Sequence, residues 1–275
     1  SIGLVQVQEL GTLETPILLT NTLSVGTVST ALVEYMLERN DDIGLDAGTV
    51  NSLVMECNDA RLSDIRGLHV TKEHARAALE AASETFAEGD VGAGAGMVCY
   101  SLKGGIGSAS RLCHLYGETY TVGALVMTNF GTLRDLRVAG DPVGERLYRQ
   151  EQSELKDKGS IIIVLATDVP LSSRQLERVA KRAQSGIART GGISGNGSGE
   201  IALAFTTGNK LAHYSSDRLE SIRLVYEEDI DEVFRAAIES VDEAIISSML
   251  HASAVTGRAG NHYKSLADLY KPGEK

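Results

Sequence analysis

The sequence contains no tryptophan, only four prolines and only three cysteines in 275 residues. Cys57, Cys99 and Cys113 form neither an even set nor a Cys-x-x-Cys pair, which argues against a disulfide framework and a cysteine-rich metal site. The sequence has no run of 18 apolar residues and no recognisable signal peptide, so it predicts neither a membrane-spanning helix nor export. We therefore expect reduced structural thiols in a cytoplasmic protein.

Positive charge is also scarce. Lysine and arginine number 26 against 37 acidic residues, for a net charge of −11. Without a long basic run, this balance argues against nucleic acid or an anionic membrane as the main partner. The six histidines form no His-Glu-x-x-His motif, so the sequence predicts no metal centre and no cofactor. A hydrophobic content of 43% over this length is enough for a large core, and we expect residues 1–275 to form a single domain.

The spacing of apolar residues predicts the secondary structure. Helices are expected over residues 24–39, 71–86, 172–188 and 228–254. Strands are expected over residues 2–8, 16–20, 95–101, 119–130, 133–138, 160–167 and 200–207. Helices and strands do not alternate strictly, so the pattern favours an α+β fold with mixed or antiparallel sheets flanked by helices.

The junction Lys158-Gly159-Ser160 leads from the polar stretch 145–158, which we expect to be an exposed linker, into the apolar run 161–166. If the Gly159–Ser160 bond were cut, Ser160 would carry both a nucleophilic hydroxyl and a free amine that can act as its base. Glycine before the serine leaves the carbonyl open to attack by the Ser160 hydroxyl. The junction is therefore a candidate site of self-cleavage, although the same residues also suit an ordinary turn before a strand.

A second segment, GGISGNGSGE at residues 191–200, leads into the apolar run 201–205. It places a hydroxyl, Ser198, two residues before a carboxylate, Glu200. In extended backbone such residues share a face, so both side chains would be able to orient one amine. A simple hairpin or loop is the alternative interpretation. The glycine-rich stretch 103–111 lacks the phosphate-binding order GxxxxGK[ST], and a loop close to an active site or a structural turn suits it better.

Four blocks in order carry a family resemblance: GAGMVCYSLKGGIGSASR, YTVGALVMTNFG, GSIIIVLATDVPL and RTGGISGNGSGEIALAF. Together they resemble the DmpA-type family of L-aminopeptidases, D-amidases and D-esterases, which also contains β-peptidyl aminopeptidases. The resemblance covers nearly the whole chain. It implies an αββα sandwich of the N-terminal-nucleophile-hydrolase type, and an assembly of several units, each made of two chains.

By this resemblance the precursor cleaves itself between Gly159 and Ser160, giving an α chain of residues 1–159 and a β chain of residues 160–275. Ser160 is then the nucleophile that forms the acyl-enzyme. The resemblance implies that Ser198 and Glu200 bind the terminal amine and assist proton transfer. It makes Asn129 a donor in the oxyanion hole, where an uncharged amide stabilises charge that develops only in the transition state.

The resemblance also implies a substrate site. Glu56, in Val54-Met55-Glu56, matches an acidic residue that meets the substrate amine, and Gly199 lies beside the reacting groups. The substrates implied are small peptides, amino-acid amides or esters. The family's glycine-rich N-terminal strands have no counterpart before Ser1, so we expect the chain to lack an N-terminal part of the family fold.

Two other functions stay open at this stage. One is a related self-cleaving enzyme, either an acyl transferase or a pantetheine-type amide hydrolase; the acetyltransferases characteristically use threonine where this chain has Ser160. The other is a non-catalytic binding or assembly protein with the same fold.

Overall fold

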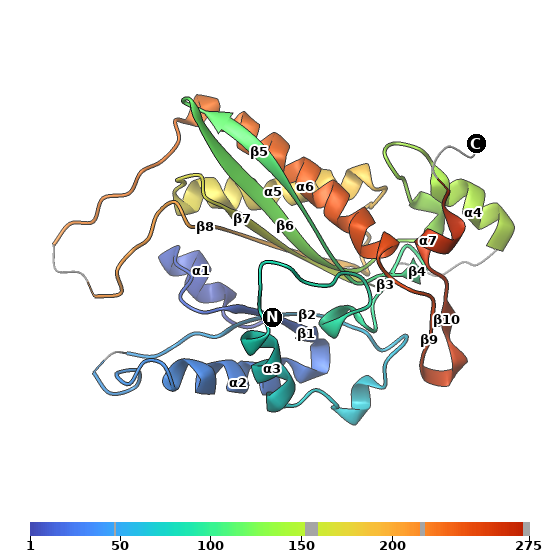
Figure 1. Cartoon of the computed structure of the whole chain (residues 1–275), viewed down its shortest axis with the longest axis horizontal. Helices are drawn as coiled ribbons and strands as arrows, with labels where there is room; N and C mark the ends of the chain where they lie inside the picture. The colour runs from blue at the N-terminus through green and yellow to red at the C-terminus, as the bar shows by residue number, and fades with distance from the viewer. Residues whose placement is uncertain (47, 152–158, 215–217, 272–275) are drawn as a thin grey trace.

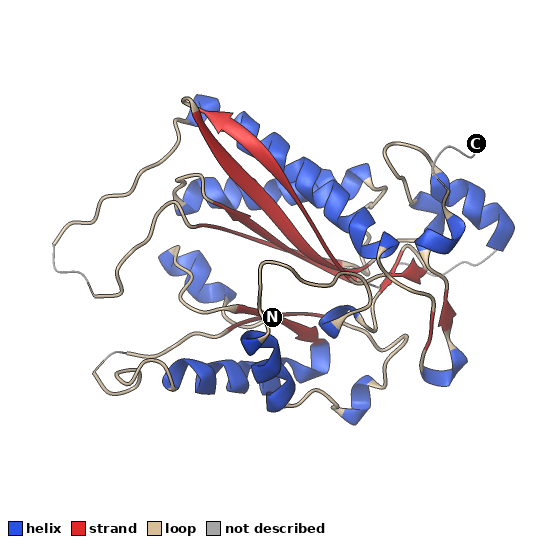
Figure 2. Cartoon of the chain, in the orientation of Figure 1, coloured by secondary structure: helices blue, strands red, loops and turns tan. Residues whose placement is uncertain are grey.

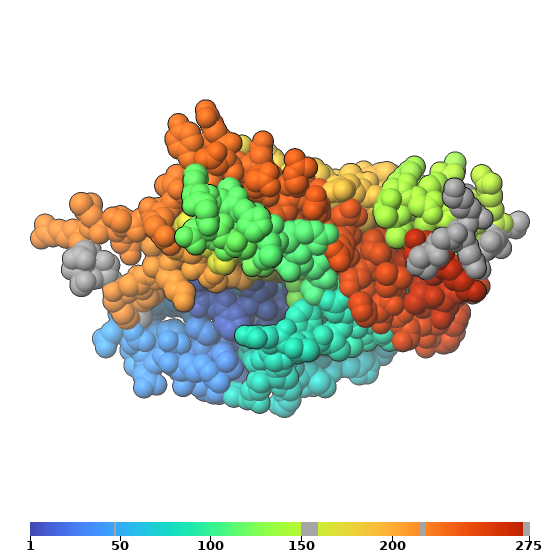
Figure 3. All heavy atoms as spheres, turned by 45° about the horizontal axis from the view of Figure 1, so that its top comes forward, coloured from blue at the N-terminus to red at the C-terminus, as the bar shows by residue number. Residues whose placement is uncertain are grey.

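The computed structural model describes residues 1–46, 48–151, 159–214 and 218–271. Its main elements form four layers, with a four-stranded sheet and a two-stranded sheet inside and helices outside both (Figures 1 and 2). The first hundred residues, blue to teal, pack against the green to red remainder of the chain over an extended contact surface (Figure 3). The predicted αββα sandwich is thus confirmed.

The larger sheet has the strand order β5 (Ile106–Leu115), β6 (Glu118–Asn129), β7 (Ser160–Thr167) and β8 (Gly199–Thr206). Neighbouring strands are antiparallel except β7 and β8, which are parallel. A parallel pair needs a crossover, and α5 (Ser173–Arg189) provides it. α5 and α6 (Asp231–Leu250) cover one face of this sheet, where the largest core cluster lies.

The opposite face packs on the small parallel sheet of β1 (Ile17–Asn21) and β2 (Leu53–Cys57). Side chains alternate between the faces of β7. Ile161 and Ile163 point to α5 and α6, whereas Ile162 joins Met55 and Leu203 between the sheets. Beyond the small sheet, α2 (Val25–Leu37) and α3 (Lys72–Glu80) form the outer layer. β7 is therefore buried on both faces along most of its length, and Ser160, its first residue, is half-buried.

Shorter elements complete the fold. They are the helices α1 (Leu4–Leu10), α4 (Val143–Glu151) and α7 (Leu266–Leu269), the strands β3 (Val98–Cys99), β4 (Leu102–Lys103), β9 (Val255–Thr256) and β10 (His262–Tyr263), and the 3-10 helices η1 (Thr22–Ser24), η2 (Ile65–Gly67), η3 (Gly92–Gly94), η4 (Leu133–Asp135), η5 (Glu227–Asp229) and η6 (Arg258–Gly260).

All four predicted helices are present, the second ending at Glu80 rather than Phe86, and the predictions for β1, β6, β7 and β8 are confirmed, whereas the strand predicted over 95–101 is limited to β3. The strand predicted over residues 2–8 is wrong: Gly3 and Gly11, both at positive φ, flank helix α1, whose Leu4 and Val7 pack on the core at helical spacing. The strand predicted over 133–138 is also wrong, because η4 begins there.

The polar stretch 145–158, predicted to be an exposed linker, is helical as far as Glu151 in α4, and residues 152–158 lie outside the described part of the chain. Strands β2 and β5 were not predicted. β5 begins inside the glycine-rich stretch 103–111, where Gly107 lets α6 approach closely, since a Cβ there would lie 2.1 Å from the Ala244 carbonyl oxygen.

Cys57, Cys99 and Cys113 are free and buried, as expected. Among the described residues, the longest helices are too short or too polar to span a lipid bilayer.

Candidate active site

Three strand ends bring the predicted site residues together. At the same end of the large sheet, Asn129 closes β6, Ser160 opens β7 and Gly199 opens β8. Ser160 is the register partner of Asn129 on one side and of Gly199 on the other. Residues separated by up to 70 positions in the sequence therefore become neighbours across the sheet.

The Ser160 side chain lies on the face of β7 that points to the small sheet, the same face as Ile162. There it lies beside the Cys57 thiol of β2, where the Ser160 hydroxyl acts to lower the pKa of the thiol, against the larger effect of burial. The thiol donates to the Met127 carbonyl oxygen at a sulfur–oxygen distance of 3.8 Å, which leaves the sulfur free to accept from the serine hydroxyl. Burial raises the pKa of Cys57 to about 12, so the thiol stays neutral beside the nucleophile.

Gly159 is pressed against the neighbouring strand. A Cβ at this position would lie 1.7 Å from the carbonyl oxygen of Asn129, so the site excludes any other residue in this conformation. The Gly159 carbonyl oxygen accepts a hydrogen bond from the Gly199 N–H at 3.1 Å. This contact polarises the carbonyl group next to the Ser160 hydroxyl.

Asn129 is 4% exposed, and its amide is fixed from two sides. Its Oδ1 accepts from the backbone N–H of Val98 at 3.0 Å, and its Nδ2 donates to the Asn58 carbonyl oxygen at 2.9 Å. A primary amide has two N–H donors. The hydrogen bonds of the described residues use one of them, so the other is available to a reacting group.

Ser198 and Glu200 flank Gly199, the register partner of Ser160. Glu200 Oε2 accepts from the Ser194 hydroxyl at 2.8 Å, and Gln184 of α5 donates to the same hydroxyl. The Ser198 hydroxyl and Glu200 Oε1 are both buried, and neither has a hydrogen-bond partner among the described residues. Buried polar atoms normally have a hydrogen-bond partner. These two atoms are therefore available to bind a further polar group.

The Glu200 side chain lies on the α5 face of the large sheet, with Ala202 and Ala204, whereas the Ser160 hydroxyl points to the other face. Glu200 also lines a hollow of about 680 Å³ between α1 and α5, with Leu4, Val7, Leu176, Ala180 and Leu203 among its other lining residues. The backbone nitrogen of Ser160 lies in the sheet between the two faces.

Glu56 precedes Cys57 in β2 and, by strand alternation, leaves the small sheet on the side away from Ser160. Its two carboxylate oxygens accept from the Thr22 hydroxyl at 2.6 Å and from the Ser1 ammonium group at 3.3 Å. The carboxylate is 20% exposed. Glu56 is thus a partly exposed carboxylate next to Cys57 in the sequence, with its side chain on the opposite face of β2.

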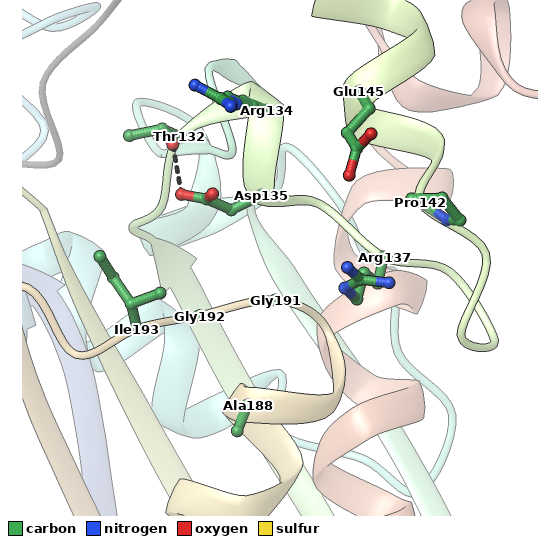
Figure 4. Close-up of a pocket in the computed structure, with 10 residues that line it drawn as sticks. All are labelled: Thr132, Arg134, Asp135, Arg137, Pro142, Glu145, Ala188, Gly191, Gly192 and Ile193. Atoms are coloured by element: carbon green, nitrogen blue, oxygen red, sulfur yellow. Dashed lines mark hydrogen bonds between the residues drawn. The ribbon is translucent and has the colours of Figure 1, made fainter.

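A polar hollow of about 660 Å³ lies beside the loop that leads to Glu200 (Figure 4). Its lining residues are Thr132, Arg134, Asp135, Arg137, Pro142, Glu145, Ala188, Gly191, Gly192 and Ile193. Thr132 donates to the Asp135 carboxylate at 2.6 Å, drawn as the dashed line. The hollow borders helix α5 at Ala188, on the sheet face away from the Ser160 hydroxyl.

Three contributors to the site were not predicted from the sequence: Ser194, Cys57 and the Val98 backbone N–H. The GGIS segment contained a signal for Ser194, since a second hydroxyl precedes Ser198 within the same glycine run. Cys57 and Val98 had no such signal, because their partners are distant in the sequence. Within the described ranges, no three histidine, cysteine or acidic side chains are grouped to hold a metal ion.

Comparison with known proteins identifies the class. The chain belongs to peptidase family S58, whose model matches residues 1–263, and it is therefore a hydrolase with the N-terminal-nucleophile hydrolase fold. It is 39% identical over 273 residues to the beta-peptidyl aminopeptidase BapA of Sphingosinicella microcystinivorans, covering 94% of this chain and 68% of that protein.

Two solved structures are also similar. The PH0078 protein of Pyrococcus horikoshii is 52% identical with a TM-score of 0.92, over 96% of this chain and 73% of that one. The L-aminopeptidase D-Ala-esterase/amidase of Ochrobactrum anthropi, described as a prototype for the serine aminopeptidases, is 38% identical with a TM-score of 0.83, over 90% and 69% of the two chains. These matches favour the predicted peptidase over an acyl transferase or a non-catalytic protein.

Proposed function

We propose that this chain is a self-processing serine aminopeptidase and amidase in which Ser160 acts first on its own chain and then on substrates. In the first step the Ser160 hydroxyl oxygen attacks the Gly159 carbonyl carbon, and the hydroxyl proton passes to the departing Ser160 nitrogen. The amide becomes an ester between Gly159 and the serine oxygen. Water then hydrolyses this ester, leaving a carboxylate on Gly159 and a free amine and hydroxyl on Ser160.

The observation that carries this proposal is the geometry around the Gly159–Ser160 bond. The Gly199 N–H already bonds the Gly159 carbonyl oxygen at 3.1 Å, and it would stabilise the negative charge that develops there. The unused N–H of Asn129 is the second donor, held by the contacts to Val98 and Asn58. A substrate carbonyl attacked by the same serine oxygen would use the same two donors.

Cleavage creates the base for the second reaction. An α-amine has a pKa of about 7.7 to 8.0 in water, so roughly a tenth to a sixth of it is neutral at pH 7, and a modest lowering of the pKa makes most of it able to accept the hydroxyl proton. The buried, unpaired atoms of Ser198 and Glu200 flank the register partner of Ser160. We infer that they pair with this new amine, which supplies the hydrogen-bond partners that the intact chain does not provide.

For turnover, the Ser160 hydroxyl attacks the carbonyl of the substrate's first residue, the leaving amine takes a proton, and water releases the acyl group. Aminopeptidase specificity needs a partner for the substrate ammonium, and Glu56, which the family resemblance assigns to this role, is our candidate because its carboxylate is partly exposed and adjoins Cys57 in β2. Small peptides, amino-acid amides and esters fit this scheme.

We further propose that the products stay together as an αβ heterodimer. Strand β6 of the α chain and β7 of the β chain are paired over eight residues of one sheet, from Val122 with Thr167 to Asn129 with Ser160. Cleavage at the start of β7 leaves this pairing intact. Higher assembly and a cytoplasmic location remain predictions.

Mass spectrometry of the purified full-length gene product tests the proposal. We expect a new amino terminus at Ser160, a Ser160→Ala variant that stays one chain, and release of amino acids from aminoacyl p-nitroanilides by the processed form alone. Ser240→Ala is the control serine, because the buried Ser240 donates to the Val122 carbonyl oxygen away from the site. An uncleaved protein with full activity would refute the scheme.

A further inference from the structure

Lys103, at the end of β4, is fully buried, with 0% of its surface exposed. Its Nζ donates to three backbone carbonyl oxygens: Gly94 at 2.9 Å, Met97 at 3.1 Å and Gly104 at 2.6 Å. An ammonium group has three N–H donors, and all three are used. Burying an ammonium group is costly unless it is well hydrogen-bonded. The three carbonyl contacts offset that cost, and a buried charge of this kind suggests a functional role for Lys103.

No carboxylate forms a salt bridge with Lys103 anywhere in the described ranges. Its charge is instead balanced by carbonyl dipoles from the segment 94–104. The Met97 carbonyl and the Val98 N–H belong to one trans peptide group and point in opposite directions. When the Met97 carbonyl oxygen binds Lys103, the Val98 N–H therefore points toward the active site. Val98 donates its N–H to Asn129 Oδ1 at 3.0 Å.

Further hydrogen bonds tie this segment to the strand that carries Asn129. The Met97 carbonyl oxygen also accepts from the Gly104 N–H at 2.9 Å. Gly105 and Thr128 exchange hydrogen bonds, with the Thr128 N–H donating to the Gly105 carbonyl oxygen at 2.9 Å and the Gly105 N–H to the Thr128 hydroxyl oxygen at 3.2 Å. Met97, which Lys103 binds, thus precedes the Val98 N–H that orients Asn129, and Gly105, two residues after Lys103, is bonded to Thr128 in the strand of Asn129.

We propose that Lys103 is a positioning residue for the oxyanion hole: its ammonium group gathers the carbonyls of residues 94–104 so that the Val98 N–H fixes the Asn129 amide. The inference rests on the proposed role of Asn129 and adds to it a buried cation that touches neither substrate nor nucleophile. By this proposal, the rate of the reaction depends on the Lys103 charge, which lies outside the substrate-binding site.

A double-mutant cycle on the processed enzyme tests this coupling. Lys103→Met keeps the length of the side chain but removes the charge and all donors. We expect kcat to fall about tenfold with KM nearly unchanged, a fraction of the 10²- to 10³-fold that an oxyanion donor is typically worth. In an Asn129→Ala background the same substitution should lower kcat less than twofold.

Gln175→Met is the matched control. Gln175 is equally buried and donates to the Val225 carbonyl oxygen at 2.7 Å on the α5 side of the sheet. Its effect on kcat should be the same with and without Asn129. If Lys103→Met and Asn129→Ala multiply independently, the inference is wrong. If Asn129→Ala alone leaves kcat unchanged, the proposed role of Asn129 fails instead.

A measurement on chains with native Lys103 covers the case in which Lys103→Met does not fold. Ser160→Ala, which should stay uncleaved, has no Ser160 amine, so selective ¹⁵N-asparagine labelling reports on Asn129 without that titration. Desolvation lowers the pKa of Lys103 to about 8, against opposing effects of the charges of Asp90 and Cys99. The Asn129 side-chain amide signals, assigned by their loss in Asn129→Ser, should shift near pH 8. Signals that stay constant from pH 6 to 10 would overturn the inference.

Discussion

Gly159→Ala offers the sharpest test of the self-cleavage geometry. The added Cβ would lie 1.7 Å from the Asn129 carbonyl oxygen, whereas ordinary contacts begin at 3.4 Å. The two groups must therefore separate by about 1.7 Å. The Gly159 carbonyl oxygen accepts a hydrogen bond from the Gly199 N–H at 3.1 Å. The displacement moves this scissile carbonyl away from both the Gly199 N–H and the Ser160 hydroxyl. Because misplacement of reacting atoms by about 1 Å can cost about 10²-fold in rate, we expect processing to slow at least 100-fold.

The assay follows conversion of the full-length precursor into two chains by gel electrophoresis and mass spectrometry. Two glycine controls separate the contact from a general effect of alanine. Gly199→Ala adds a Cβ at an ordinary 3.8 Å from Ser160 Cβ, and Gly26→Ala adds one in α2 with nothing within 4 Å. Both should process much faster than Gly159→Ala. Processing of Gly159→Ala at the normal rate would show that the close contact with Asn129 does not govern the reaction.

Two further predictions concern groups around Ser160. Glu200→Gln should keep the fold by circular dichroism but lose most turnover on aminoacyl p-nitroanilides, because a neutral amide at this position cannot balance an ammonium charge; unchanged turnover would remove Glu200 from its proposed role. Cys57 and Cys113 should resist a thiol reagent at pH 8 in the native protein and react on unfolding, because burial raises their pKa values to about 12 and about 11, which leaves almost no thiolate. Rapid native labelling of Cys57 would contradict the packing of the thiol beside Ser160.

The sequence predicted those parts of the fold in which one physical signal dominates. The run 161–166 is apolar on both faces, as a strand buried between a helical layer and a second sheet must be. The amphipathic pattern of residues 172–188 matches α5 closely. The segments 2–8 and 133–138 were misread because both contain alternating apolar residues, and only the positive φ of Gly3 and Gly11 and the contacts of Leu133 decide in favour of helical turns.

The candidate site also has some features that the sequence predicted and others that it did not. Chemistry within one residue, such as the hydroxyl and prospective amine of Ser160, is visible in the sequence. Contacts between segments are not: the thiol that meets Ser160 comes from β2, and the N–H that orients Asn129 comes from β3. Lys103 looked like part of a glycine-rich loop, and nothing in the local pattern indicated that its side chain would be buried in a cage of carbonyls.

The two faces of the large sheet explain why the nucleophile opens a central strand. The Ser160 hydroxyl points to the small sheet and Cys57, while the Glu200 carboxylate points to α5. The α-amine created by cleavage is a backbone atom, so it lies between these faces. A serine in the middle of the strand would have its nitrogen committed to the peptide bond, and a serine in an exposed loop would lack the fixed donors of Asn129 and Gly199. Only the first residue of a buried strand combines a free amine with neighbours held by the sheet on both sides.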